Sequence, residues 1–195
     1  MGEPLYRDER QKIQLEAINA LQLFDEVQAL FHSHSSAHII SRPEIELLHK
    51  VAIKDIYSCA GRCREWSVTI VGSRHKPPGH PYVEGLIDQM CDEANSREDW
   101  DELEVAAYVL WRMNWIHPFA GGNGRTSRAA CYLVLCRRLG FMPPGKLTIL
   151  EQIVSHRTRY QDGLEDADAA WRSDSLDVSK LIALLHDFLV EQLKG

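Results

Sequence analysis

The sequence predicts an all-α fold with one small β-hairpin, and three observations support that class. Apolar residues recur every three or four positions along most of the 195 residues, which is the spacing of a helix face. Only residues 61–81 break this period, with apolar and polar residues alternating as in a strand. Hydrophobic residues make up 45% and charged residues 26% of the chain, which is typical of a globular domain and excludes collagen-like, disordered and membrane-spanning classes.

The N-terminal part is expected to contain two helices separated by a polar break. The first is amphipathic and covers Asp8–Phe31. Ser41 and Glu44 have the spacing of a capping box, and Pro43 stands in the first turn that follows. The second helix is therefore expected to start there and to run to about Tyr57.

The alternating stretch is expected to form a short strand or hairpin. Residues 66–71 read Trp-Ser-Val-Thr-Ile-Val, so that every second side chain would face the same way. Gly72-Ser73 and the cluster Lys76–Gly79 then mark turns and a loop.

Helical spacing dominates the rest of the chain. One helix begins near Arg125 and stops at Gly140, a usual position for a left-handed residue at a helix end. The other expected helices cover residues 81–95, 99–116, 147–164 and 178–193. We expect residues 1–44 to be a helical extension of a main domain over residues 45–195, the two forming one compact unit.

The segment that carries chemistry is residues 117–128, HPFAGGNGRTSR. It reads as helix, tight glycine turn and helix, so that the free N–H groups of the second helix and its dipole form an anion site. The glycines let the backbone approach a ligand closely, and Asn123 tolerates a positive φ and has side-chain donors. Arg125 and Arg128 are three residues apart on one helix face and match phosphate oxygens, which favours a diphosphate or triphosphate ligand.

His117 lies at the mouth of this turn. Its ordinary pKa is ~6.5, so it can accept a proton near neutral pH. A base beside a polyphosphate site suggests transfer chemistry, in which His117 deprotonates a hydroxyl that then attacks a bound phosphate. Phe119 is expected to be a core anchor of the turn.

The run HPFAGGNGRTSR resembles the signature of Fic-domain proteins, H-P-F-x-(D/E)-G-N-G-R-x-x-R, and departs from it only at Gly121. The resemblance extends to a flap hairpin upstream and to a Y-x-x-x-L element downstream, here Tyr160 to Leu164. It covers about residues 45–193 and implies a Fic-like helical bundle.

The resemblance also implies a function. Fic proteins mostly transfer AMP from ATP to a Ser, Thr or Tyr hydroxyl of a target protein, with His117 as the general base. Tyr160 would lie near the adenine pocket. The anion hole would be formed by Gly122, Asn123 and Gly124, and the outer phosphates would be held by Arg125 and Arg128. The target would add a strand to the flap backbone at Ser67, Val68, Thr69, Ile70 and Val71.

Gly121 stands where the family has an Asp or Glu that holds Mg²⁺, and glycine has no side-chain oxygen for that hard cation. Three consequences remain open. Mg²⁺ is held by phosphates and water alone, or another acid such as Asp162, Glu165 or Asp166 reaches in. Alternatively, the protein is a non-catalytic nucleotide-binding regulatory module, or it uses another phosphate-containing donor.

The family's inhibitory helix, (S/T)-x-x-x-E-(G/N), does not occur in this sequence. Glu16 on the first helix is a loose candidate, but Lys12 stands four residues before it and Ala17 follows. The sequence therefore favours either no internal brake or a separate inhibitory protein, and a homodimer is compatible with an exposed flap.

Charge, hydropathy and cysteine content limit the classes of partner and the cellular location that we expect for this protein. The formal net charge of −6 argues against a nucleic-acid partner. The longest uncharged apolar run, Ala129–Cys136, is too short to span a bilayer. Five cysteines without a signal-like N-terminus favour a reducing, cytoplasmic location.

Cys59, Cys63, His75 and His80 approximate the spacing of a zinc finger. The acidic net charge, the single copy and the Pro-Pro-Gly loop beside the histidines argue against this interpretation. Small half-buried thiols and loop histidines are the expected alternative.

Overall fold

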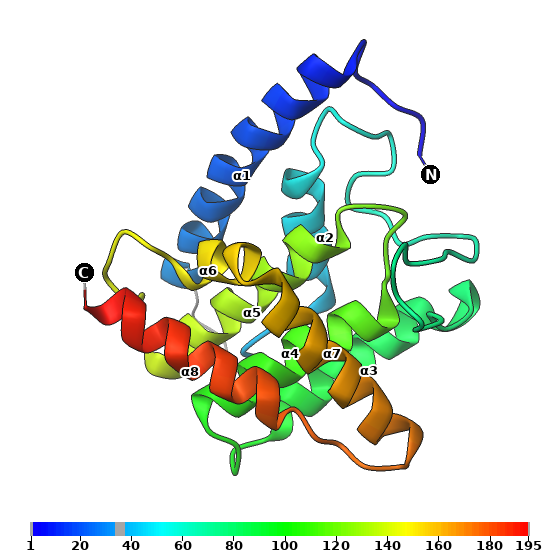
Figure 1. Ribbon diagram of the computed structural model, residues 1–195. Coiled ribbons are helices and arrows are strands. Elements are labelled where there is room, and N and C mark those ends of the chain that lie inside the picture. Colours follow the sequence, from blue (N-terminus) through cyan, green and yellow to red (C-terminus); the bar gives the residue numbers. More distant parts are fainter. Residues whose placement is uncertain (1, 34–37, 195) are drawn as a thin grey trace.

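The computed structural model describes residues 2–33 and 38–194, and in these ranges the chain forms eight α-helices and one 3-10 helix (Figure 1). In chain order they are α1 (Glu9–His32), α2 (Arg42–Ala52), η1 (His80–Tyr82), α3 (Val83–Ser96), α4 (Glu102–Ile116), α5 (Asn123–Leu139), α6 (Ile149–Ser155), α7 (Arg157–Arg172) and α8 (Ser179–Leu193). The predicted all-α class is confirmed.

Helices α4 and α5 form the centre of the fold (Figure 1). Every residue of Val105–Met113 and of Ala129–Cys136 is buried, and helices that are covered on all sides belong inside a domain. Helices α1, α2 and α6 pack against α5, whereas α3, α7 and α8 pack against α4. In the described ranges, no helix is both long and apolar enough to cross a membrane.

Helix α1 is anchored at several points. Asp8 caps its start by accepting a hydrogen bond from the N–H of Gln11 at 2.8 Å. The side-chain amide of Asn19 donates to the carbonyl of Lys54 at 2.8 Å, which ties α1 to the turn after α2. Figure 1 shows α1 along one edge of the molecule, and its contact with α5 carries Glu16 toward the start of that helix.

Helix α2 starts after Ser41, as predicted, but its last residue and its capping contact differ from the prediction. It ends at Ala52 rather than near Tyr57, because the chain turns at Ile53 and Asp55 has a positive φ of 59°. The predicted capping box at Ser41 is not formed. Its hydroxyl donates to the Glu44 carboxylate at 2.8 Å and caps no backbone N–H.

The alternating stretch at residues 66–71 is a loop, which corrects the predicted strand. Within the described parts of the chain these six residues pair with no other strand, and the isolated β-bridge joins Pro4 to Tyr57. Gly72 turns the chain with a φ of 79°, and the N–H of Ser73 donates to the carbonyl of Ile70 at 3.2 Å. A lone two-stranded hairpin is marginal in water, and Val71, 97% exposed, has no sheet to pack against.

The predicted helix over residues 147–164 is two helices. His156 ends α6 and begins α7, with φ −109° and ψ 45°. Thr148 and Glu151 form a capping box at the start of α6, so this short helix has its own start signal. Gly140 ends α5 in the left-handed conformation, as predicted.

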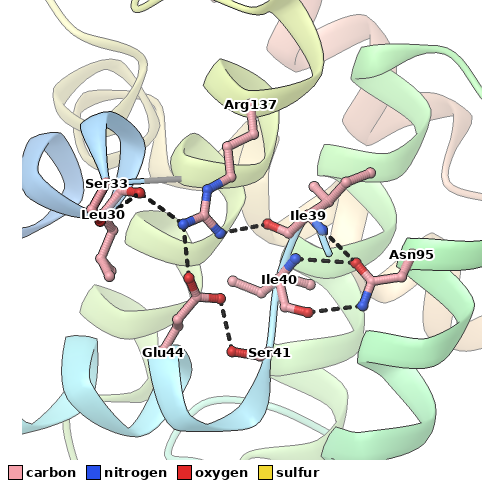
Figure 2. A network of polar contacts seen from close by, with 8 residues as sticks. All are labelled: Leu30, Ser33, Ile39, Ile40, Ser41, Glu44, Asn95 and Arg137. Atoms are coloured by element: carbon pink, nitrogen blue, oxygen red, sulfur yellow. Dashed lines mark hydrogen bonds and ion pairs between the residues drawn. The ribbon is translucent and has the colours of Figure 1, made fainter. Parts of the chain in front are cut away.

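A buried arginine joins the ends of α1 and α2 to α5 (Figure 2). Arg137 donates to the carbonyls of Leu30 and Ile39, both at 2.8 Å, and to the Glu44 carboxylate at 2.7 Å. Its side chain is 2% exposed. The Glu44 carboxylate thus bonds to both Arg137 and the Ser41 hydroxyl, and it links the start of α2 to α5.

We expect Arg137→Met to lower the free energy of unfolding by about 3 kcal/mol, because it leaves the Glu44 carboxylate and two carbonyls without their donor. Arg159→Met is the matched control. Arg159 pairs with Asp187 at 2.7 Å, but both side chains are more than half exposed, so its loss should cost less than about 1 kcal/mol. Urea unfolding of both variants measures the difference, and equal losses would contradict the assigned role of Arg137.

Candidate active site

The turn between α4 and α5 begins at His117, which ends α4 in the left-handed conformation with a φ of 49°. Gly122 then begins α5 with a φ of 77°. A Cβ on Gly122 would lie 2.5 Å from Cγ2 of Ile53, so the close approach of α2 also requires glycine there. Gly121 has neither a positive φ nor any atom within 4 Å of a Cβ, so this position is open.

A buried histidine that the sequence analysis missed supports the turn. His49 of α2 stacks on Phe119, with ring centroids 3.7 Å apart and planes 8° apart. Its Nε2 lies 3.0 Å from the Gly121 carbonyl, and its Nδ1 accepts from the N–H of Gly61 at 3.0 Å, so Nε2 carries the proton. Burial lowers the pKa of His49 to about 4, which keeps this ring neutral. Phe119 is fully buried, as expected of a core anchor.

The side chain of Asn123 is used inside the turn, which corrects the expectation that it donates to a ligand. Its Oδ1 accepts from the N–H of Phe119 at 2.9 Å, and its Nδ2 donates to the Phe119 carbonyl at 2.8 Å. Asn123 also has no positive φ; Gly122 takes that conformation instead. The backbone N–H groups at the start of α5, including those of Asn123 and Gly124, have no acceptor within the helix and remain its contribution to an anion site.

A cavity of about 360 Å³ lies beside this turn. Of the twelve residues predicted to act in catalysis, nucleotide binding or target docking, five line it: Ile70, Val71, His117, Arg128 and Tyr160. The other seven lie outside its lining: Ser67, Val68, Thr69, Gly122, Asn123, Gly124 and Arg125. Asn114 and Glu165 also line the cavity, and Asn114 donates to the hydroxyl of Tyr160 at 2.8 Å. The structure thus brings the base, one arginine and the tyrosine together.

His117 is held neutral in this cavity. Burial lowers its pKa to about 4, and the positive charge of Arg64 acts in the same direction. Its Nδ1 is buried and has no hydrogen-bond partner among the described residues. At neutral pH the ring is therefore unprotonated and able to accept a proton.

The two arginines of the turn have different surroundings. Arg128 faces the cavity, and its Nη1 would lie 3.2 Å from a Cβ on Gly124, so the guanidinium lies close to the start of α5. Burial lowers the pKa of Arg128. Arg125 instead meets Glu16 of α1, with 3.3 Å between Nη2 and Oε1, and its buried Nη1 has no partner in the described residues. Glu16 therefore reaches the turn although its sequence context does not match the inhibitory motif.

The residues around the turn do not fit a Mg²⁺ ion held by the protein. Gly121 has no oxygen-bearing side chain, and residues 2–33 and 38–194 contain no group of three or more His, Cys, Asp or Glu that could hold a metal. Of the three candidate acids, Glu165 lines the cavity, Asp166 pairs with Lys180, and Asp162 is not part of the lining. In the described ranges Cys59, Cys63, His75 and His80 do not form such a group either.

The fold and the site together define a helical protein with a cavity, lined by both basic and acidic side chains, beside the start of a buried helix. The sequence model of the Fic/DOC family matches residues 39–135, from just before α2 into α5. This chain belongs to the Fic/DOC family.

Known relatives agree with this assignment. The protein adenylyltransferase Fic of Aedes aegypti is 32% identical over 110 residues, which are 55% of this chain and 20% of that protein. The structure of Caenorhabditis elegans Fic-1, residues 134–508, superposes with a TM-score of 0.76 at 23% identity, over 100% of this chain and 53% of that one. BepC of Bartonella tribocorum, solved with bound AMPPNP, gives a TM-score of 0.62 at 16% identity, over 90% and 86% of the two chains. The chain thus spans about one fifth of the curated relative, and the structures establish the shared fold.

Gly121 and Gly122 form a matched pair for testing the turn. Gly122→Ala should destabilise the protein by about 2 kcal/mol, because the new methyl group collides with Ile53 and alanine is strained at a positive φ. Gly121→Ala should change stability by no more than ~0.5 kcal/mol, since nothing lies near it. Urea unfolding of both variants tests this, and a large loss in Gly121→Ala would contradict the geometry.

Proposed function

We propose that this protein is a Fic-type protein adenylyltransferase that moves AMP from ATP to a Ser, Thr or Tyr hydroxyl of a target protein. The hydroxyl oxygen attacks the α-phosphorus of ATP and a new P–O bond forms. The bond from that phosphorus to the β-phosphate bridge breaks, and pyrophosphate leaves. His117 takes the hydroxyl proton, so that the atoms and charges balance.

One observation carries the proposal. In a chain of the Fic/DOC family, His117, Arg128 and Tyr160 line a single cavity of about 360 Å³ next to the start of α5. Ligand pockets for small molecules have volumes of this order. The name of the Aedes aegypti relative and the AMPPNP in BepC support the same activity and the same class of ligand.

His117 suits the role of base because it is neutral before the donor binds. Its pKa of about 4 makes it a weak base before a donor binds. Phosphate groups bound beside it would favour its protonated form and raise that pKa toward neutrality. The ring would therefore become a stronger base when the donor is in place.

The phosphate end of the donor would lie at the start of α5. The free N–H groups of that helix and the Arg128 guanidinium supply donors and positive charge. Arg125 adds a second guanidinium, whose buried Nη1 has no partner among the described residues. In this proposal the positive charge that neutralises the phosphates comes from the protein, and no step depends on a metal ion.

The target would dock on residues 67–71. Their backbone takes part in no ladder within the described chain, so an extended target segment can pair with it. Ile70 and Val71 also line the cavity, which would bring the docked hydroxyl near His117.

A second candidate is a regulatory module that binds a nucleotide without transferring it, and Gly121 favours this alternative. Metal-ion neutralisation is worth several kcal/mol in phosphoryl chemistry, and this turn has no carboxylate for a metal. A transferase with another phosphate-containing donor is compatible with the same observation.

Labelled ATP distinguishes these functions. The protein is incubated with ATP labelled at either the α- or the γ-phosphate, with and without Mg²⁺, in the presence of a cell extract as a source of targets. We expect protein to be labelled from the α-phosphate alone, and His117→Ala to lower the rate by at least about 100-fold. Gly121→Glu, which the open position accommodates, should increase labelling in the presence of Mg²⁺.

Each other outcome contradicts a stated part of the proposal. Label from the γ-phosphate would mean phosphoryl transfer rather than AMP transfer. Tight ATP binding without labelling by the wild type, together with labelling by Gly121→Glu, would establish the binding module. Undiminished labelling by His117→Ala would remove His117 as the base.

Glu16 competes with phosphate for Arg125. It comes from α1, and both side chains of the ion pair are partly exposed, so the contact is of moderate strength. Glu16→Gln should therefore lower the dissociation constant for ATP by about two- to fivefold, as measured by calorimetry.

Glu9→Gln is the matched control for this prediction. Glu9 also lies on α1 and pairs with Lys12 at 2.9 Å, away from the turn. Its replacement should leave ATP binding unchanged. If Glu16→Gln binds ATP no more tightly than this control, Arg125 does not contact the phosphates.

A further inference from the structure

One buried arginine between α2 and η1 bonds to four main-chain carbonyls. The side chain of Arg64 is almost fully enclosed, since the residue is 3% exposed. Its Nε donates to the carbonyl of His117 at 2.8 Å, and its Nη2 to those of Pro78 at 2.6 Å and Ile116 at 3.3 Å. Its Nη1 donates to the carbonyl of Trp66 at 3.0 Å.

These acceptors come from three separate stretches of chain. Ile116 is the last residue of α4 and His117 follows it, at a helix end where the carbonyls have no donor within the helix. Trp66 and Pro78 stand on either side of residues 67–77, which include the proposed docking segment. The N–H of Arg64 also donates to the carbonyl of Pro118 at 2.9 Å, which adds a fifth bond to the same turn.

We propose that Arg64 is a positioning residue for the transfer, which holds the backbone of His117 and both ends of residues 67–77 in one fixed arrangement. The inference rests on the proposed function, in which the hydroxyl of a target docked on residues 67–71 must lie within reach of His117. Arg64 does not line the cavity, so it acts through these neighbours and not on the nucleotide.

The chemistry of the group supports this role. A planar guanidinium offers five N–H donors in fixed directions, whereas a lysine ammonium is a point charge with three donors. Among the described residues Arg64 has no carboxylate partner, and its four side-chain hydrogen bonds all end on main-chain carbonyls. The charge is felt at the site as well, since Arg64 helps to lower the pKa of His117.

Arg137 is a matched control for a purely structural role. It is equally buried and also bonds to main-chain carbonyls, at Leu30 and Ile39, but it joins α5 to α1 and α2 and contacts neither the turn nor residues 67–77 (Figure 2). A lysine at either position keeps the charge and loses the fork of donors.

The test compares Arg64→Lys with Arg137→Lys by hydrogen exchange, ATP calorimetry and the rate at which α-labelled ATP labels proteins of a cell extract. We expect Arg64→Lys to speed the exchange of the amides of Ser73, His75 and His117 at least tenfold. The dissociation constant and the KM for ATP should stay within twofold of wild type, while the labelling rate at saturating ATP falls at least tenfold. Arg137→Lys should speed amide exchange near residues 39–44. It should leave the KM for ATP and the labelling rate at saturating ATP unchanged.

Two results would overturn the positioning role. The first is that the exchange rate of the amides of Ser73, His75 and His117 increases no more in Arg64→Lys than in Arg137→Lys. The other is a labelling rate that falls only in proportion to the folded fraction. If the wild type labels nothing, the proposed function fails, and exchange together with ATP binding still decides whether Arg64 couples the two segments.

If Arg64→Lys does not fold, the wild-type protein itself can be used to test the inference. Native-state hydrogen exchange in low denaturant measures the opening free energy of each amide. The amides of Arg64, His75 and His117 should open together with one free energy. Separate openings would show that Arg64 does not join the turn to residues 67–77.

Discussion

The candidate site depends on how the chain leaves α4. The helix ends at Ile116, and His117 follows it in the left-handed conformation, so the carbonyls of these two residues have no donor within the helix. Buried carbonyls without donors are costly, so a group with several N–H bonds must stand there. Arg64 is that group, and its position determines where residues 66 and 78 lie relative to the base.

The start of α5 is held from the other side by stacking and hydrogen bonds. His49 covers one face of Phe119, and Asn123 bonds to both main-chain groups of the same residue. These contacts fix the turn without using the first N–H groups of α5, which stay available for an anion. A rigid turn of this kind loses little conformational freedom when a ligand binds.

The sequence predicted what depends on local pattern. The periods of α4 and α5, the left-handed Gly140 and the glycine turn can all be read from neighbouring residues. It did not predict the break between α6 and α7 at His156 or the loop at residues 66–71. Nor did it predict that His49, Arg64 and Glu16 contact a turn that lies far from them along the chain. The bonds of the Asn123 side chain to Phe119 were likewise not foreseen, because they depend on how the turn folds back on itself.

The missing carboxylate at Gly121 changes the balance of charge around the turn. A carboxylate there would offset part of the charge of Arg125 and Arg128. With glycine at this position, the acidic partner of Arg125 within the described residues is Glu16, which belongs to α1. A phosphate that binds Arg125 must therefore weaken the contact between α1 and α5. By thermodynamic linkage, the docking of α1 weakens phosphate binding by the same factor. The first helix is thus energetically part of the site, although sequence pattern alone separates it from the turn by more than a hundred residues.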